Sequence, residues 1–228
     1  MHTDWDKIVE KVNSSVVKIE TPDGSGTGFL MLFSEEKAWC GIATALHVVQ
    51  EADEWQKPIK IHPYDFSKPP LFLPDSERII FTSWKTDSAV IFFPTPSDLK
   101  FPENLIPLRP INSPLPVGAE LGWMGFPFLE PFDICFFSGI VSGRKEARNT
   151  YMIDGVAVKG VSGGPVIFSS PTDGTQFIGV ISSYRAGGEQ LPGLLYAYMS
   201  LICILSFLQL NQWMKQGRKR PKKKPEKN

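Results

Sequence analysis

Twelve short β-rich segments in two sets of six constrain the fold of this chain more than any other feature. No long helical pattern separates the segments within a set, so a parallel sheet with helical crossovers is not expected. Short strands at such spacing predict an all-β protein made of two small antiparallel barrels or sandwiches. The first set is SVVKIE, GFLMLF, AWCGIAT, IKIH, RIIFTS and SAVIFF, and the second is AELGWMG, ICFFSGIVSG, TYMID, GPVIFS, QFIGVIS and LLYAYMS.

A proline-rich segment separates the two sets. Seven prolines lie between Pro94 and Pro116. Proline has no backbone N–H to donate to a β-ladder, which indicates a connector and not a central strand. We therefore predict the first β unit with an N-terminal helix over residues 1–100, the connector over 101–116 and the second β unit over 117–200.

Helices are predicted at both ends of the β region. The N-terminal one has apolar residues at positions i, i+3, i+4 and i+7, namely Trp5, Ile8, Val9 and Val12. Residues 201–216 carry a broad apolar stripe, but its length is below the about 20 residues that span a bilayer. Two alternatives remain for this segment: a helix packed against the second β unit, or an interfacial membrane anchor with Trp213 at headgroup level.

Charge is distributed unevenly along a chain whose formal net charge is zero. Segment 215–228 holds eight basic residues and one acidic residue, so the rest of the chain carries about minus seven. The tail, residues 217–228, is too polar and too rich in Lys and Pro to fold by itself. It predicts either a solubilising tail or a site for an acidic partner: a nucleic acid, an anionic membrane or a nuclear-import factor. It contains no aromatic residue, which argues against specific base recognition.

Cysteine content bears on the compartment. Cys40, Cys135 and Cys203 are odd in number and far apart, with no ligand-like spacing to a histidine. We expect buried free thiols, no metal site and no cofactor. The N-terminus MHTDWDKIVEKV has no apolar core of a secretory signal. These features predict a cytoplasmic protein, with nuclear import through the tail as a further option.

One histidine, one aspartate and one serine form the candidate catalytic set. His47 lies in TALHVVQ, where a β segment of small residues gives way to a short helix, and Asp87 lies in WKTDSAVIFF directly before an apolar strand. Ser162 lies in KGVSGGPVI. Each residue alone fits an ordinary structural or turn position. The chain order His, Asp, Ser across two β units is one of the known orders of the serine-hydrolase triad.

The chemistry requires these residue types. A serine hydroxyl is a poor nucleophile at neutral pH and needs a nearby imidazole as base. His47 would take the proton of Ser162, and Asp87 would hold the other ring nitrogen as a donor. The glycines allow a tight turn in which the backbone N–H groups of Gly160 and Ser162 form an oxyanion hole.

These motifs together resemble the trypsin-like serine proteases of the chymotrypsin fold, above all the protease domain of the high-temperature-requirement (HtrA/Deg) group. The resemblance runs in the family's order over roughly residues 8 to 200. It implies two six-stranded antiparallel β-barrels with the site between them, and a serine endopeptidase acting on protein or peptide substrates through an acyl-enzyme. The motifs that carry it are VEKVNSSVVKIE, GSGTGF, TALHVV, TDSAVIFF, GWMGFPF, SGIVSG, KGVSGGPV, IGVIS and GLLYAYMS.

The chain departs from these relatives at three places. Val161 precedes Ser162, where the group has Asn and digestive relatives have an Asp that pairs with a newly cut N-terminus. The resemblance therefore implies no zymogen cleavage. Val48 follows His47, where secreted relatives have a disulfide cysteine. No PDZ domain follows the protease-like region, so the oligomeric state is not carried over.

The first specificity pocket is predicted from the same resemblance. Val156 stands where relatives that cut after Lys or Arg have an acid, so cleavage after a basic residue is not expected. Ser182, Ser183 and Tyr184 would form the wall along which substrate adds as a strand. The predicted preference is for small or medium aliphatic residues. The alternative to an endopeptidase is a catalytically silent or latent binding module of the same fold, which Val161 keeps open.

Overall fold

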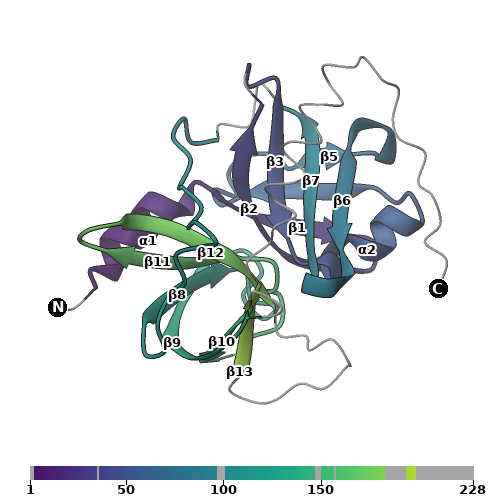
Figure 1. Ribbon diagram of the computed structural model, residues 1–228. Coiled ribbons are helices and arrows are strands. Elements are labelled where there is room, and N and C mark those ends of the chain that lie inside the picture. Colours follow the sequence, from purple (N-terminus) through teal and green to yellow (C-terminus); the bar gives the residue numbers. More distant parts are fainter. Residues whose placement is uncertain are drawn as a thin grey trace.

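A computed structural model of the protein describes residues 3–34, 36–96, 101–146, 150–156, 158–182 and 194–198. Within these residues the chain forms one curled antiparallel sheet and one closed antiparallel barrel, accompanied by two α-helices (Figure 1). The predicted all-β, chymotrypsin-like double barrel with an N-terminal helix is confirmed. The C-terminal helix predicted over 201–216, the tail 217–228 and Cys203 lie outside the described residues.

The first unit is a sheet of seven strands in the order β5-β4-β1-β2-β3-β7-β6. Six of these strands match the predicted segments, and β5 is additional. β5 lies between Pro70 and Pro74 and occupies an edge of the sheet, where flanking prolines interrupt no ladder on the outer side. Its short length and these prolines conceal it in the sequence. The strands are β1 (Val16–Thr21), β2 (Gly24–Phe33), β3 (Trp39–Thr44), β4 (Ile59–Pro63), β5 (Leu71–Leu73), β6 (Ile79–Ser83) and β7 (Ser88–Pro94).

The second unit is a closed barrel of six strands in the order β10-β13-β12-β11-β8-β9. All six correspond to predicted segments, because alternating apolar residues and turn signals bound each of them. The strands are β8 (Glu120–Gly125), β9 (Cys135–Lys145), β10 (Thr150–Asp154), β11 (Pro165–Ser170), β12 (Gly174–Ser182) and β13 (Leu194–Tyr198).

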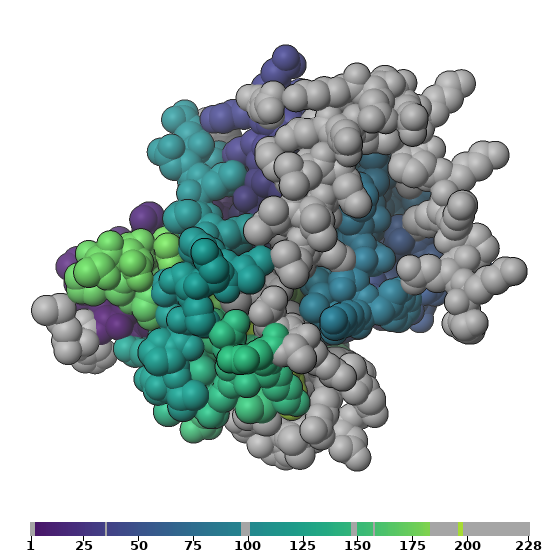
Figure 2. Space-filling model, in the orientation of Figure 1, coloured from purple at the N-terminus to yellow at the C-terminus, as the bar shows by residue number. Residues whose placement is uncertain are grey.

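Helix α1 (Trp5–Asn13) precedes the first sheet in sequence but packs on the second barrel. The Trp5 ring lies 5.0 Å from that of Phe136, and the Trp5 indole N–H donates to a Glu120 carboxylate oxygen at 2.8 Å. The Thr3 hydroxyl donates to the other oxygen of the same carboxylate, also at 2.8 Å. Purple N-terminal atoms accordingly lie beside the green β11–β12 hairpin in Figure 2. The helix therefore ties the two units together.

A shared hydrophobic core joins the two units. Phe29 and Met31 of β2 belong to the same buried cluster as Met124 of β8 and Phe177 of β12. The rings of Phe29 and Phe177 meet edge to face with centroids 4.7 Å apart. Burial of this much apolar surface makes the seam a packed interior, and it fixes the two units relative to each other.

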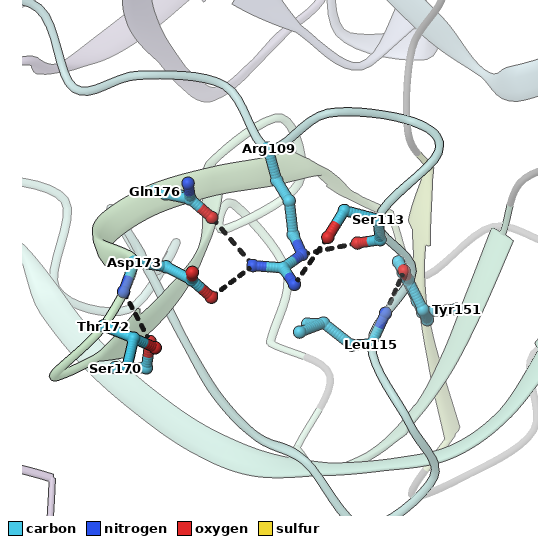
Figure 3. A network of polar contacts seen from close by, with 8 residues as sticks. All are labelled: Arg109, Ser113, Leu115, Tyr151, Ser170, Thr172, Asp173 and Gln176. Atoms are coloured by element: carbon cyan, nitrogen blue, oxygen red, sulfur yellow. Dashed lines mark hydrogen bonds and ion pairs between the residues drawn. The ribbon is translucent and has the colours of Figure 1, made fainter.

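The connector is bound to the second barrel along part of its length. The Arg109 N–H donates to the Phe177 carbonyl at 2.8 Å, and the Phe177 N–H donates to the Pro107 carbonyl at 2.9 Å. The Arg109 guanidinium donates to Gln176 at 2.8 Å and to the Ser113 carbonyl at 2.6 Å (Figure 3). The prolines of the connector have no N–H group to pair. The Arg109 N–H and the Pro107 carbonyl need partners, and β12 supplies them.

Two cysteines fall within the described residues, and both are free thiols. Cys40 is fully buried, and burial raises its pKa to about 12. Cys135 is only half-buried at the start of β9, so the prediction of a buried thiol is wrong there. No helix among the described residues is long and apolar enough to cross a membrane.

Candidate active site

His47 is the second residue of helix α2 (Leu46–Glu54). The strand before it, β3, ends in the fully buried residues Ala43 and Thr44, and Ala45 follows. Small side chains at these positions let the chain pass from the sheet into the helix without a gap in the core. The predicted strand-to-helix transition at His47 is confirmed.

Asp87 sits between a short 3-10 helix (Trp84–Thr86) and β7, in a left-handed conformation with φ of 41°. Aspartate tolerates this region better than most residues. Its backbone carbonyl accepts from the Leu46 N–H at 3.1 Å, and its Oδ1 accepts from the His47 N–H at 3.1 Å. Ala45 makes no side-chain cap at the start of α2, so Asp87 satisfies the first N–H groups of this helix.

The side chains of His47 and Asp87 are in direct contact. His47 Nδ1 lies 2.7 Å from Asp87 Oδ2, and both side chains are partly exposed, at 29% and 19%. Because the carboxylate accepts, Nδ1 is the donor and Nε2 is the ring nitrogen that can take up a proton. Asp87 thus fixes the position of the helix and the tautomer of the imidazole together.

A third side chain, Ser182, completes the hydrogen bonding of Asp87. Ser182 is fully buried at the end of β12, and its hydroxyl donates to Asp87 Oδ2 at 2.7 Å. The sequence predicted Ser182 in the wall of a substrate pocket. Its side chain instead points to Asp87, which leaves only its backbone for such a wall. A lone serine at a strand end gave no signal of this contact.

Ser162 lies in the second of two successive tight turns, residues 158–161 and 161–164. The Val161 N–H donates to the Val158 carbonyl at 3.2 Å, and the Gly164 N–H donates to the Val161 carbonyl at 3.0 Å. The third residue of each turn is a glycine with positive φ, 96° at Gly160 and 92° at Gly163. A positive φ at this position is typical of the type II turn, which favours glycine. Gly160 and Gly163 of KGVSGG are therefore required by the conformation of the turns.

The turn type determines where the N–H of Gly160 points. Types I and II differ by about 150° in ψ of the second residue and about 170° in φ of the third, which inverts the peptide between them. In this structure the Lys159 carbonyl accepts from the Phe128 N–H at 2.8 Å. In a trans peptide the N–H points opposite to the carbonyl. The Gly160 N–H is therefore directed away from Phe128.

The Ser162 N–H follows the same rule in the second turn. The Val161 carbonyl is engaged by Gly164, so the Ser162 N–H points to the opposite side of that peptide. In each of these two peptides a hydrogen bond to the carbonyl fixes the direction of the N–H group. Two such N–H groups, two residues apart, are the kind of donor pair that stabilises an oxyanion.

Close packing brings this turn against the segment that leads into His47. A Cβ at Gly163 would overlap the Thr44 hydroxyl and lie 2.9 Å from the backbone nitrogen of Ala45, two residues before His47. The Gly163 N–H also donates to the Ile181 carbonyl at 2.9 Å, next to Ser182. Ser162, partly buried, therefore lies beside the segment that leads into His47 and near the end of β12, where Ser182 bonds Asp87.

The residue before Ser162 contributes by burial. Val161 is 3% exposed and belongs to the core of the second barrel with Leu121, Trp123 and Tyr151. An apolar residue thus anchors the turn here.

The predicted pocket residues are less closely tied to this site. Val156 is 63% exposed, so its side chain lies at the surface. Ser183 and Tyr184 lie outside the described residues. The pocket stays a prediction.

Comparisons with known proteins agree with this architecture. Neither the comparison with protein-family models nor that with curated proteins gives a match. Among solved structures, Deg5 is similar at 20% identity and a TM-score of 0.64, over 95% of this chain and 98% of that one.

The Rv3671c protease from M. tuberculosis H37Rv is similar in two structures of its inactive form, one of them an alanine variant, both with a TM-score of 0.58. The variant is 19% identical over 95% of this chain and 93% of that one, and the other is 18% identical over 92% and 93%. The chain accordingly has the double-barrel fold of the trypsin-like serine proteases and is similar in fold to Deg5 and to the Rv3671c protease over most of its length.

Proposed function

We propose that this protein is a serine endopeptidase in which His47, Asp87 and Ser162 act as the catalytic triad. The observation that carries the proposal is the 2.7 Å contact between His47 Nδ1 and Asp87, together with the packing of the Gly160–Gly164 turns against the segment that leads into His47. The similarity in fold to the Rv3671c protease supports the same reaction class.

The proposed reaction proceeds in two halves. Ser162 Oγ attacks the peptide carbonyl carbon while Nε2 of His47 takes the hydroxyl proton, and the Gly160 and Ser162 N–H groups stabilise the oxyanion. The C–N bond then breaks, and His47 protonates the leaving amine, which leaves an acyl-enzyme on Ser162. Water activated by His47 hydrolyses this ester and restores the hydroxyl. Asp87 stabilises the imidazolium in both halves.

Substrate preference follows from the residues predicted to line the first pocket. Val156 offers no charge for a basic side chain, so we propose cleavage after Val, Ala, Ile or Leu. The backbone of Ser182, with Ser183 and Tyr184, would pair with the substrate as an extra strand. When a peptide library is digested, most cleavage sites should have an aliphatic residue directly before the cleaved bond. Cleavage mainly after Arg or Phe would contradict this preference.

Covalent labelling tests the proposed reaction. A fluorophosphonate probe should label the unmodified protein and leave Ser162→Ala unlabelled, because the probe reacts with an activated serine. Ser169→Ala is the matched control on β11, where the Ser169 hydroxyl lies 3.3 Å from the Thr175 hydroxyl. The control should label at the normal rate. An unmodified protein that neither labels nor cuts unfolded substrates would establish the alternative, a silent module of this fold.

The basic tail 217–228 is proposed to bind an acidic partner, a nucleic acid or an anionic membrane, in the cytoplasm or the nucleus. Eight basic residues in segment 215–228 support an electrostatic, salt-sensitive interaction. Deletion of residues 217–228 should abolish retention on heparin at low salt and leave peptide cleavage unchanged. Equal retention of the full and the shortened chain would remove the tail from any such role.

A further inference from the structure

Thr27 is a first-sheet residue whose three polar groups all reach the segments around the candidate site. It lies in β2 and is completely buried. Its hydroxyl donates to the Gly160 carbonyl at 2.8 Å and accepts from the Phe126 N–H at 3.0 Å. Its backbone N–H donates to the Ser162 carbonyl at 2.9 Å. We infer that Thr27 is a positioning residue that holds the oxyanion turn in its donor orientation, an inference that rests on the proposed function.

The contacts of Thr27 fix the peptides on either side of the nucleophile. Its hydroxyl sets the peptide that follows Gly160, and its N–H sets the peptide that follows Ser162. The peptide before Gly160 is held by Phe128 through the Lys159 carbonyl. Thr27 also binds the N–H of Phe126, two residues before Phe128. The Thr27 hydroxyl therefore bonds both the turn itself, at Gly160, and the segment that holds the turn, at Phe126.

The surrounding glycines fit this arrangement. A Cβ at Gly125 would lie 2.6 Å from the Thr27 hydroxyl oxygen, and a Cβ at Gly163 would overlap the Thr27 carbonyl. These two positions admit only glycine without a shift of Thr27 or its neighbours. The Thr27 carbonyl in turn accepts from the Thr44 hydroxyl at 2.7 Å. Thr27 is thus held from its own sheet while it holds the turn of the other barrel.

Loss of the hydroxyl would have a defined consequence. The buried Gly160 carbonyl and Phe126 N–H would lose their partner, and buried polar groups without partners are costly. The segment from Phe126 to Phe128 can relieve this cost by moving, and because the Phe128 N–H holds the Lys159 carbonyl, such a movement frees the peptide that carries the Gly160 N–H to rotate between the two turn types. Such a rotation would turn an oxyanion donor away, which lowers stabilisation of the transition state more than binding of the substrate.

Thr27→Val tests the inference, because valine replaces the hydroxyl by a methyl group of similar size. We expect kcat to fall by about 10- to 100-fold with KM changed less than about threefold. This decrease is smaller than that for complete loss of an oxyanion donor, because only part of the molecules would have the Gly160 peptide rotated. Thr27→Ser keeps the hydroxyl and should retain activity close to the parent. Thr175→Val is the control, since this buried threonine of β12 contacts Ser169 instead of the site.

Amide NMR separates this inference from the proposed function. In Thr27→Val the Gly160 and Ser162 amide resonances should shift, whereas in Thr27→Ser and Thr175→Val they should stay near the parent positions. Unshifted Gly160 and Ser162 amides in the valine variant, or equal losses of kcat in the serine and valine variants, would overturn the role of the hydroxyl. Failure of the unmodified protein to react with the fluorophosphonate probe would overturn the proposed protease function. The NMR comparison would then still test whether the Thr27 hydroxyl holds the turn. If the valine variant does not fold, Thr27→Ala replaces it in the comparison with serine.

Discussion

The two barrels contribute to the candidate site in different ways. The first sheet contributes side chains, His47 from the start of a helix and Asp87 from the residue before a strand. The second barrel contributes backbone groups, the N–H donors of a double turn around Ser162. That barrel also carries the side chain of the proposed nucleophile, Ser162. Contacts across the seam, by Thr27 in one direction and Ser182 in the other, connect the two contributions.

This difference shows which part of the site tolerates which kind of change. Side-chain chemistry depends on residue type and position, because an imidazole can transfer a proton near neutral pH and a carboxylate can stabilise the imidazolium that forms. Backbone chemistry depends on conformation, because every residue except proline carries an N–H and only the turn aims it. Substitutions that change a side-chain group and leave the backbone alone therefore test the contribution of the first sheet. Substitutions that only add a Cβ to a glycine test the backbone contribution of the second barrel.

Asp87→Asn should produce the largest loss in the first sheet. The amide oxygen can still accept from the His47 N–H, so helix α2 should keep its start, but His47 would lose the carboxylate that stabilises its imidazolium. Turnover should fall by about four orders of magnitude. The measurement is kcat on an aliphatic peptide substrate, with Asp173→Asn as a control on the 43% exposed aspartate beside Arg109. A loss below tenfold would argue against Asp87 as the triad acid.

Gly160→Ala should produce a smaller loss, confined to the second barrel. A Cβ there would overlap the Phe126 carbonyl and lie 2.8 Å from the Phe128 nitrogen, and φ of 96° disfavours alanine. Displacement of one oxyanion donor should lower kcat by about 100- to 1,000-fold. Gly174→Ala is the control, because it also has positive φ, 70°, but open space around it. Equal activity losses in the two variants would point to general backbone strain and away from the oxyanion hole.

Ser182→Ala should have a moderate effect that crosses the seam. Asp87 would lose one charge-assisted hydrogen bond and keep those from His47. We expect about a tenfold decrease in kcat, in the range of a hydrogen bond to a charged group. Unchanged kinetics would show that the first sheet orients its own triad pair without help from the second barrel. Parallel unfolding curves distinguish lost stability from lost activity.

Arg109→Met should affect stability alone. Methionine keeps an apolar stem near Phe168, whose ring lies 4.9 Å from the Arg109 guanidinium carbon, but loses the bonds to Ser113 and Gln176. The free energy of unfolding should fall by about 1–2 kcal/mol, and the melting temperature by about 2–8 °C. kcat per folded molecule should not change. A change in kcat would place the connector within the functional machinery.

Most of the fold could be predicted from local patterns, and its exceptions have physical reasons. Among the residues that the structure describes, twelve of the thirteen strands follow from β-branched and aromatic segments bounded by turn residues. The missing one, β5, is short, lies at an edge and is flanked by prolines that read as loop. The half-buried position of Cys135 was also missed, because apolar neighbours in sequence do not establish burial on a given face of the barrel.

The three residues of the proposed triad could be predicted from the sequence, because few residue types can perform their chemistry and the chain carries them in a known order. Tertiary structure alone showed the contact of Ser182 with Asp87 and brought in Thr27. Serine and threonine occur throughout β-proteins, and their roles depend on which buried groups of another segment they meet. Sequence patterns record local conformation and residue chemistry, so they determined the strands, the glycine turns and the candidate nucleophile. Contacts between residues such as Thr27 and Gly160, 133 positions apart, exist only once the two barrels have packed, and packing alone decided how the turn is held.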